Sequence, residues 1–291
     1  MLYRFILLTS ILLFNVGPAG AAQAPAPGAS LRAAYDELQA RLRSNPFGRP
    51  LHLDSHESSS DLKGDMHAAV DHPYALMATS LNNAGVWCDI LILHLNTKFC
   101  EAENDGGRET LAVNIGKKYD QPVEKTYQVR FDFRVTSATA DYFSVVLNAA
   151  TGPYGTKNYR ILLEAVPLAG GRTFIHLSYS YGFGLTARLA MQAYLGTIGS
   201  AKVGFTETGK KTDGEPEYVG GVRGMIERNK MRYFLAIESY LDSLSVSVDA
   251  RVEKRLNDWF VAIERYPRQL HEMEREDYLA MKRREIRRQQ G

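Results

Sequence analysis

The residue types best suited to chemistry in this sequence are its histidines. Five of the seven lie close together along the chain: His52, His56, His67, His72 and His94. Imidazole groups are common metal ligands, so such a group suggests a metal site. However, His52 and His56 share one face of an expected strand, opposite Leu51 and Leu53, which is typical of a solvated face, and no H-E-x-x-H motif occurs. We therefore expect no bound metal ion.

A second chemical pattern is Gly182-Phe183-Gly184-Leu185-Thr186-Ala187, which matches the G-x-G-x-x-A signature of dinucleotide-binding sites. That signature needs a parallel βαβ unit with the phosphate at a helix N-terminus, whereas the surrounding segments have the pattern of an antiparallel meander. Two glycines that turn the chain from a strand into a helix explain the match. Because the G-x-S-x-G motif is also missing, we assign no catalytic residue and no cofactor.

The only two cysteines, Cys88 and Cys100, are candidates for a disulfide. A bridge between them would close a loop of about 13 residues and stabilise the fold by on the order of 3 kcal/mol. One straight strand would hold the two ends about 40 Å apart, so a bridge requires the chain to bend near residues 89–93. A metal site or a thiol nucleophile is the alternative, but the C-x-x-C spacing is missing.

The first residues have the pattern of a secretory signal peptide. A positive start at residues 1–4 precedes an apolar run from Phe5 to Val16 and a cleavage site at Ala19-Gly20-Ala21. The apolar run is too short for a membrane anchor, which needs roughly 20 residues. We expect residues 1–21 to be removed, residues 22–30 to form a flexible, extended leader, and the protein to be exported to the periplasm or the extracellular space.

The overall composition is that of a folded globular protein. The 291 residues are 45% hydrophobic and 23% charged, and the formal net charge is only +2. So small a charge gives no electrostatic reason to expect a nucleic-acid partner. The length allows one large domain with a substantial buried core.

The elements that must position any site follow from the periodicity of apolar residues. Residues 31–43 have helical spacing, residues 51–56 and 62–70 read as a hairpin, and residues 73–87 return to helical spacing. Six strands then follow as an antiparallel meander. Their expected ranges are 93–101, 110–117, 125–136, 141–150, 158–166 and 172–181. Helices are expected at residues 185–195 and within 214–244.

In this order of elements the sequence resembles the START and polyketide-cyclase-like (SRPBCC) superfamily. The resemblance is carried by residues 73–87, by the run Trp87-Cys88-Asp89-Ile90-Leu91-Ile92-Leu93-His94, and by the helix from Gly221 to Leu244. It covers residues 31–245 and implies an α+β helix-grip fold, in which a curved antiparallel sheet wraps around a long C-terminal helix. It also implies a cavity for a hydrophobic or amphipathic molecule such as a lipid or sterol.

Aromatic and polar residues on the expected sheet and long helix are the candidate ligand contacts. Tyrosine combines an apolar ring with a hydroxyl that can orient such a ligand, although aromatic residues also simply favour strands. The candidates are Trp87, His94, Tyr142, Tyr159, His176, Tyr179, Tyr181, Asn229 and Tyr233.

Residues 246–291 are expected to be a helical appendage with a basic end. The last ten residues carry five basic side chains and one acidic side chain. A solvated, frayed tail is one interpretation, and peripheral contact with an anionic membrane is the other. The candidate contacts are Lys282, Arg283, Arg284, Arg287 and Arg288.

Three functions are compatible with these patterns. The first is an exported binding protein, for example a lipid carrier, that holds a hydrophobic small molecule by apolar burial. The second is a cyclase-like or hydrolase-like enzyme that uses the same cavity, with His94 or His176 beside a tyrosine as acid or base. The third is an envelope interaction protein that acts through the helices after residue 245.

Overall fold

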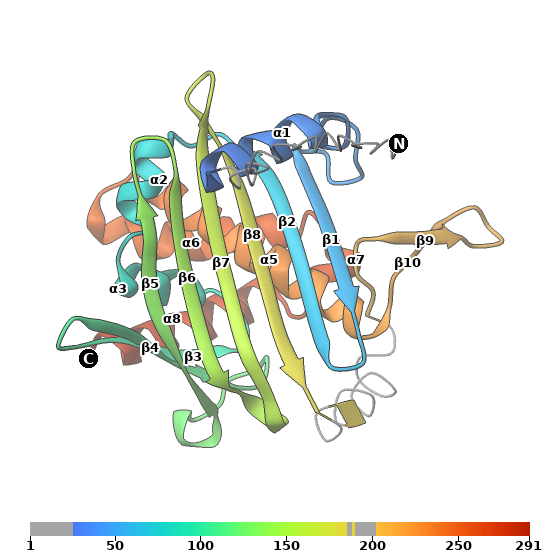
Figure 1. Cartoon of the computed structure of the whole chain (residues 1–291). Helices are drawn as coiled ribbons and strands as arrows, with labels where there is room; N and C mark the ends of the chain where they lie inside the picture. Colours follow the sequence, from blue (N-terminus) through green and yellow to red (C-terminus); the bar gives the residue numbers. More distant parts are fainter. Residues whose placement is uncertain (1–25, 185–187, 190–201) are drawn as a thin grey trace, which may run out of the picture.

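An eight-stranded antiparallel sheet is the centre of the fold (Figure 1). The computed structural model describes residues 26–184, 188–189 and 202–291. The strands of this sheet are β1 (Leu51–Glu57), β2 (Asp61–Val70), β3 (Thr97–Asp105), β4 (Arg108–Ile115), β5 (Tyr127–Ala138), β6 (Phe143–Thr151), β7 (Thr156–Leu168) and β8 (Arg172–Phe183). The spatial order is β1-β2-β8-β7-β6-β5-β4-β3, so β8 returns to pair with the early hairpin.

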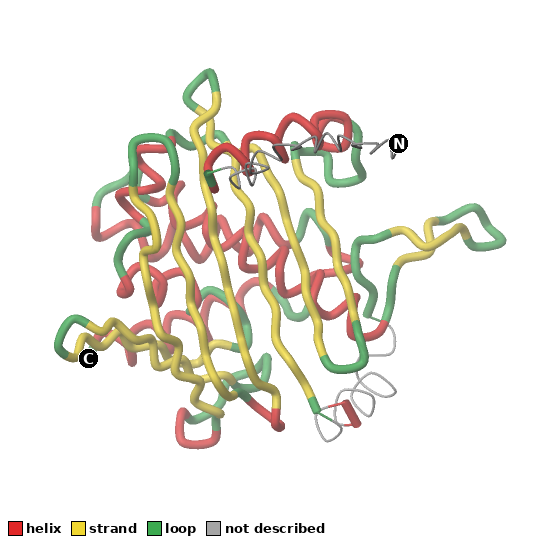
Figure 2. Tube along the Cα trace, viewed as in Figure 1, coloured by secondary structure: helices red, strands yellow, loops and turns green. Residues whose placement is uncertain are grey.

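Helices cover both faces of this sheet (Figures 1 and 2). Helix α1 (Pro27–Arg43) crosses the face that we call the outer face. The long helix α5 (Gly221–Ser243) lies behind the opposite, inner face. The remaining helices are α2 (Tyr74–Ser80), α3 (Ala84–Leu91), α6 (Val248–Ile263), α7 (Pro267–Leu270) and α8 (Arg275–Gln290), with short 3-10 turns η1 (Val123–Lys125) and η2 (Pro153–Gly155).

Strict alternation along the strands separates the two faces. In β5, Val129, Phe131 and Phe133 are buried against the inner core, while Arg130 and Arg134 are exposed. Successive side chains of a strand point to opposite sides of the sheet, so a period of two in hydrophobicity buries one face. The predicted α+β helix-grip fold is therefore confirmed, with a helix of about 34 Å packed on the inner face.

The boundaries differ from the predicted ranges in several places. Residues 73–87 are expected to form one helix, but α2 ends at Ser80, and Asn83 then caps α3 by accepting hydrogen bonds from Gly85 N and Val86 N. The leader expected at residues 22–30 is helical from Pro27 onward. The segment 214–220 contains part of a small hairpin, β9 (Glu207–Lys210) with β10 (Pro216–Tyr218), that helical periodicity did not reveal.

Other expectations fall outside the described residues. These are the signal peptide at residues 1–21 and most of the helix at residues 185–195. The glycine pattern is described only in part, and Gly182 lies in β8, which pairs antiparallel with both β2 and β7. An antiparallel strand cannot supply the βαβ unit of a dinucleotide site, and Gly182 lies within the strand rather than in a turn.

The residues after Ser245 pack into the same hydrophobic core as the sheet and α5. Leu256, Trp259 and Ile263 of α6 are almost completely buried, as are Tyr278 and Leu279 of α8. The region expected to be an appendage thus contributes to the main core. In the part of the chain that the structure describes, no helix has both the length and the apolar character needed to cross a bilayer.

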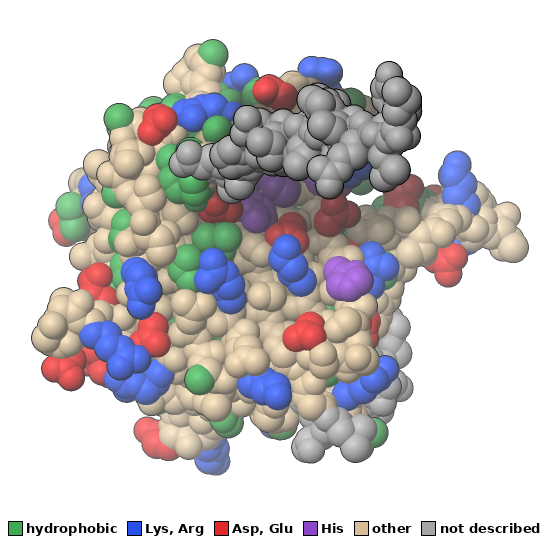
Figure 3. All heavy atoms as spheres, viewed as in Figure 1, with side chains coloured by type: hydrophobic (Ala, Val, Ile, Leu, Met, Phe, Trp, Pro, Cys, Tyr) green, Lys and Arg blue, Asp and Glu red, His purple; other side chains and the backbone are tan. Residues whose placement is uncertain are grey.

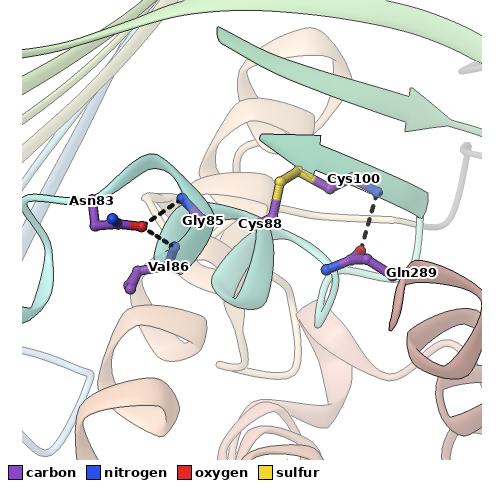
Figure 4. Close-up of a disulfide and its surroundings, with 6 residues drawn as sticks. All are labelled: Asn83, Gly85, Val86, Cys88, Cys100 and Gln289. Atoms are coloured by element: carbon purple, nitrogen blue, oxygen red, sulfur yellow. Dashed lines mark hydrogen bonds between the residues drawn. A yellow bond between two sulfur atoms is a disulfide. The ribbon is translucent and has the colours of Figure 1, made fainter. Parts of the chain in front are cut away.

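The predicted disulfide is present and joins α3 to β3 (Figure 4). The Cα atoms of Cys88 and Cys100 are 5.2 Å apart, because the chain leaves α3 at Ile92 and turns before β3 begins at Thr97. Gln289 of α8 accepts a hydrogen bond from Cys100 N at 3.1 Å. The disulfide and α8 therefore together hold β3, the last strand at this edge of the sheet.

Candidate functional site

Seven aromatic side chains form a continuous group between the inner face and α5, which we call the ring cluster. Its members are His94, Phe131, Tyr159, Tyr179, Tyr181, Phe183 and Tyr233. The ring of Tyr159 stacks on that of Tyr181 with centroids 5.1 Å apart, and Tyr179 lies 6.3 Å from Tyr233 of α5. The ring cluster thus brings together five of the predicted ligand contacts, which come from β7, β8, α5 and the segment after α3: His94, Tyr159, Tyr179, Tyr181 and Tyr233.

Some members of this region keep accessible surface although they lie deep in the fold. Tyr179, Tyr233 and Asn229 are only half-buried, whereas Phe234 and Ile237 of α5 are enclosed. Asn229 and Tyr233 are one helical turn apart and therefore share a face of α5. Tyr179 of β8 and Tyr233 of α5 therefore lie next to each other and both keep accessible surface.

The ionisation of the tyrosines follows from burial. Burial raises the pKa of Tyr233 to about 12 and that of Tyr179 well above its ordinary value. The phenols are therefore neutral at physiological pH, and each can donate or accept one hydrogen bond without carrying charge. A site of this kind suits a largely apolar molecule with a few polar atoms.

His94 is the polar end of the ring cluster. Its ring stacks on Tyr233 with centroids 4.8 Å apart, and its Nδ1 accepts a hydrogen bond from Asn96 N at 3.1 Å. Burial, followed by the charges of Arg232, Lys282 and Lys118, lowers the pKa of His94 well below its ordinary value. The ring is thus neutral with its proton on Nε2, and among the described residues Nε2 has no hydrogen bond within 3.5 Å.

Trp87 lies apart from the ring cluster in the core between α3 and the sheet. Its Nε1 donates to Leu81 O at 2.9 Å, and its ring is 6.5 Å from that of Phe133. The indole is almost completely buried and its N–H group is satisfied within the protein. Trp87 therefore packs in the core and does not lie beside Tyr179 and Tyr233.

Tyr142 and His176 do not reach the inner face, and the structure corrects their assignment as ligand contacts of the cavity. Tyr142 packs with α1 on the outer face, and its hydroxyl donates to Glu164. His176 lies between Asp65 and Glu164, with a distance of 2.8 Å from a ring nitrogen to each carboxylate. In β8 the odd-numbered residues from Ile175 to Phe183 face the inner core, so the even-numbered His176 must face outward.

On the outer face these side chains form an ionic group, which we call the His176 cluster: Asp65, His67, Tyr142, Glu164 and His176. Figure 3 shows histidine and acidic side chains gathered on this face beside α1. Burial opposes the charge on His176, but its hydrogen bonds to Asp65 and Glu164 outweigh burial and raise its pKa. The stacked His67, 4.4 Å away, has its pKa lowered to about 3 by burial and by the charge of His176.

His94 and His176, the two histidines predicted as possible acid or base groups, have different neighbours. His176 has two carboxylates beside it but lies on the face away from the ring cluster, whereas His94 meets a ring face of Tyr233. Within the described ranges, no three His, Cys, Asp or Glu side chains are grouped so as to hold a metal ion.

The predicted membrane contacts of α8 have two different environments. Lys282 is completely buried, and its Nζ donates to His94 O at 2.6 Å and to Thr97 O at 2.8 Å. It therefore cannot contact lipid headgroups, which corrects that assignment. Arg283 and Arg284 lie at the surface in ion pairs with Glu253 and Asp120. Arg287 and Arg288 are exposed.

Sequence reasoning did not identify the buried charges around His94. Lys98 and Lys282 share the carboxylate of Glu285, and all three side chains are fully buried. Arg232 and Glu272 form a second buried pair at 2.8 Å. A partial signal was Arg232 within the apolar stretch of residues 231–237, because charged residues are rarely buried without a partner.

A cleft of about 460 Å³ lies elsewhere, between α5, α6 and the ends of β1 and β2. Its walls carry charges that pair with one another, including Arg49 with Glu238 and Lys254 with Asp258 at 2.8 Å. His72 Nε2 is 3.4 Å from Asp242 Oδ1. With these charges mutually satisfied, the cleft offers little selectivity for a ligand of one charge.

No protein-family model and no curated protein matches the sequence. The chain is similar in structure to truncated norcoclaurine synthase from Thalictrum flavum, with 16% identity, a TM-score of 0.35, and coverage of 49% of this chain and 90% of that one. Ara h 8.0201 gives 14% identity and a TM-score of 0.37 over 66% and 99% of the two chains. The ZhuI aromatase/cyclase from Streptomyces sp. R1128 gives 13% identity and a TM-score of 0.30, with coverage of 74% of this chain and 94% of that one. At such values the similarity says nothing about activity, and the fold assignment rests on the strand order and helices described above.

Proposed function

We propose that this protein binds a hydrophobic or amphipathic small molecule between the inner face of the sheet and α5. The observation that supports the proposal is the ring cluster, in which Tyr179 and Tyr233 remain half-buried beside otherwise enclosed neighbours. Apolar contact with these rings contributes roughly 25 cal/mol per Å² of buried surface. The tyrosine hydroxyls and the Asn229 amide orient the polar atoms of the ligand.

Binding of the neutral dye Nile red, followed by its fluorescence, tests this proposal. We expect saturable binding that Tyr179→Ala weakens about tenfold, since one lost aromatic contact is worth about 1.4 kcal/mol. Tyr142→Ala is the matched control, because it removes the same side chain from the outer face of the sheet. Equal loss in both variants, or no saturable binding at all, would count against the ring cluster as the site. Mass spectrometry of organic extracts from the purified protein then identifies any molecule that copurifies.

We propose further that the protein is exported. The pairing of Cys88 with Cys100 supports an oxidising compartment, as does the apolar run at residues 5–16. Alkaline phosphatase, which is active only after export, can be fused to the chain with and without residues 1–21. We expect activity only from the fusion that keeps these residues. Retention of the complete fusion in the cytoplasm would show that the proposal is wrong.

A further inference from the structure

Positive charge is in excess where α5 meets the loop before α8. Glu272 lies there among three cations that, together with it, we call the Glu272 cluster. Lys118 Nζ and Arg232 Nη2 are 2.6 Å and 2.8 Å from Glu272 Oε1, and Lys202 Nζ is 3.3 Å from Oε2. Only 2% of the Arg232 side chain and 7% of the Glu272 side chain are exposed. One carboxylate therefore faces three cations in a largely buried place.

The neighbouring buried network also has more cations than carboxylates, two to one. Lys98 and Lys282 share the single carboxylate of Glu285, and Lys282 also donates to the backbone carbonyl of His94. Charge that is buried without compensation destabilises a protein unless a counter-charge is supplied. Both networks act on His94, because Lys282 and the Glu272 cluster members Arg232 and Lys118 all lower its pKa.

His94 also connects these charges to the ring cluster. Its ring stacks on Tyr233, which directly follows Arg232 in α5. Its Nε2–H is buried beside the side chain of Asn229 and makes no hydrogen bond within 3.5 Å among the described residues. The positive charges and the polar atoms of His94 thus lie at one end of the apolar rings.

From this arrangement we infer that the Glu272 cluster binds the oxyanion of an amphipathic ligand whose apolar part lies on the ring cluster. The inference rests on the proposed function and adds a ligand class, namely a carboxylate or similar acidic group attached to an apolar chain or ring system. Lys118 and Lys202 are the accessible members, with 28% and 29% of their side chains exposed. Among the described residues Lys118 Nζ donates only to Glu272, so two of its N–H groups remain for an anion.

Competition against Nile red tests the inference. Dodecanoate and dodecan-1-ol have chains of the same length, and they differ in charge. We expect dodecanoate to displace the dye at about tenfold lower concentration than the alcohol, because charge-assisted hydrogen bonds are stronger than neutral ones. Lys118→Met should remove this preference and leave displacement by the alcohol unchanged. Lys117→Met is the control, since this adjacent lysine lies at the surface over the ring of Tyr119.

The outcomes separate the inference from the proposed function. Equal displacement by dodecanoate and the alcohol, or a preference that survives Lys118→Met, overturns the inference and leaves a neutral ligand for the ring cluster. Displacement by acetate at the same concentration as dodecanoate would likewise overturn it, because the anion would then bind without the apolar chain. If neither Nile red nor dodecanoate binds, the proposed function fails and the inference fails with it.

Discussion

The two faces of one sheet carry opposite kinds of side chain. On the inner face, Tyr159, Tyr179 and Tyr181 form a neutral aromatic layer against α5. On the outer face, His176 is held between two carboxylates beneath α1. His176 and Tyr179 are three residues apart in the same strand, so the period of two, and not distance along the chain, decides which chemistry each residue joins.

The two faces also accommodate partly buried ionisable groups in different ways: the inner groups are neutral and the outer groups are charged and paired. The inner tyrosines keep their protons, since burial raises their pKa. The outer carboxylates keep their charge, because hydrogen bonds from His176 outweigh burial and lower the pKa of Asp65 and of Glu164. A neutral layer can admit an apolar ligand without leaving a charge unpaired, whereas separating the outer ion pairs would leave buried charges.

Among substitutions that distinguish the two faces, we expect Tyr181→Ala to have the largest effect on the free energy of unfolding. Tyr181 is 7% exposed and contacts three aromatic neighbours of the ring cluster. Its truncation leaves a cavity, so we expect the free energy of unfolding to fall by about 3 kcal/mol. Urea denaturation measures this change. A loss below about 1 kcal/mol, as for a surface substitution, would contradict the placement of Tyr181 in the inner core.

His176→Gln tests the outer face through its pH dependence. The pKa of His176 is raised above its ordinary value of 6.5. The contribution of His176 to stability is therefore complete below pH 6.5 and is lost as the pH rises through the pKa of the folded state. The lowered pKa values of Asp65 and Glu164 make their stabilisation complete above their ordinary values of 3.8 and 4.5 and remove it as the pH falls. The cluster therefore stabilises most between about pH 4.5 and pH 6.5.

We expect His176→Gln to lower the free energy of unfolding by about 2 kcal/mol near pH 5.5 and by less than about 1 kcal/mol near pH 9. Urea denaturation at both pH values checks this, with His56→Gln as a control, because His56 lies at the exposed end of β1. A cost that increases toward pH 9 would contradict a charged His176 between the two carboxylates.

Tyr142→Phe should have a smaller effect. It removes the hydrogen bond to Glu164 and keeps the ring against α1, so we expect a loss of about 1 kcal/mol in unfolding free energy. Nile red affinity should not change, since the residue lies on the outer face. A weaker dye affinity would instead place the ligand under α1.

The smallest effect is expected from the double substitution Arg287→Gln and Arg288→Gln. Both side chains are exposed near the end of α8, so stability should change by less than about 0.5 kcal/mol. The same variant tests the predicted membrane contact, for which cosedimentation with vesicles containing phosphatidylserine should fall several-fold. Unchanged sedimentation would show that these arginines do not bind an anionic membrane.

Local patterns predicted the sheet well because they act over a few residues. The alternation in β5 and the turn after β1 identified their strands directly, and the cysteine spacing identified the bend between α3 and β3. The β9-β10 hairpin was missed because its strands are short and exposed and therefore have no buried face to create a pattern. The start of α1 was missed because Pro27 was interpreted as part of an extended leader, although proline is well tolerated in the first turn of a helix.

The candidate site could be predicted only in part, for a related reason. Alternation alone shows that His176 and Tyr179 lie on opposite faces, so not both could line one cavity. It does not show which face is the inner one, because both faces of this sheet are covered by helices. The Glu272 cluster could not be predicted, since its four residues come from positions 118, 202, 232 and 272 and meet only after α5 and the C-terminal helices have packed.

The sequence by itself determined the α+β architecture, the disulfide and the aromatic character of the strands, because each depends on composition and short-range periodicity. The tertiary structure alone decided that α8 belongs to the core, that Lys282 is buried beneath His94, and that three cations share one carboxylate beside the rings. Such arrangements depend on contacts between residues far apart in the chain. Burial removes water from these charges, so the interactions between them become strong only once the chain has folded.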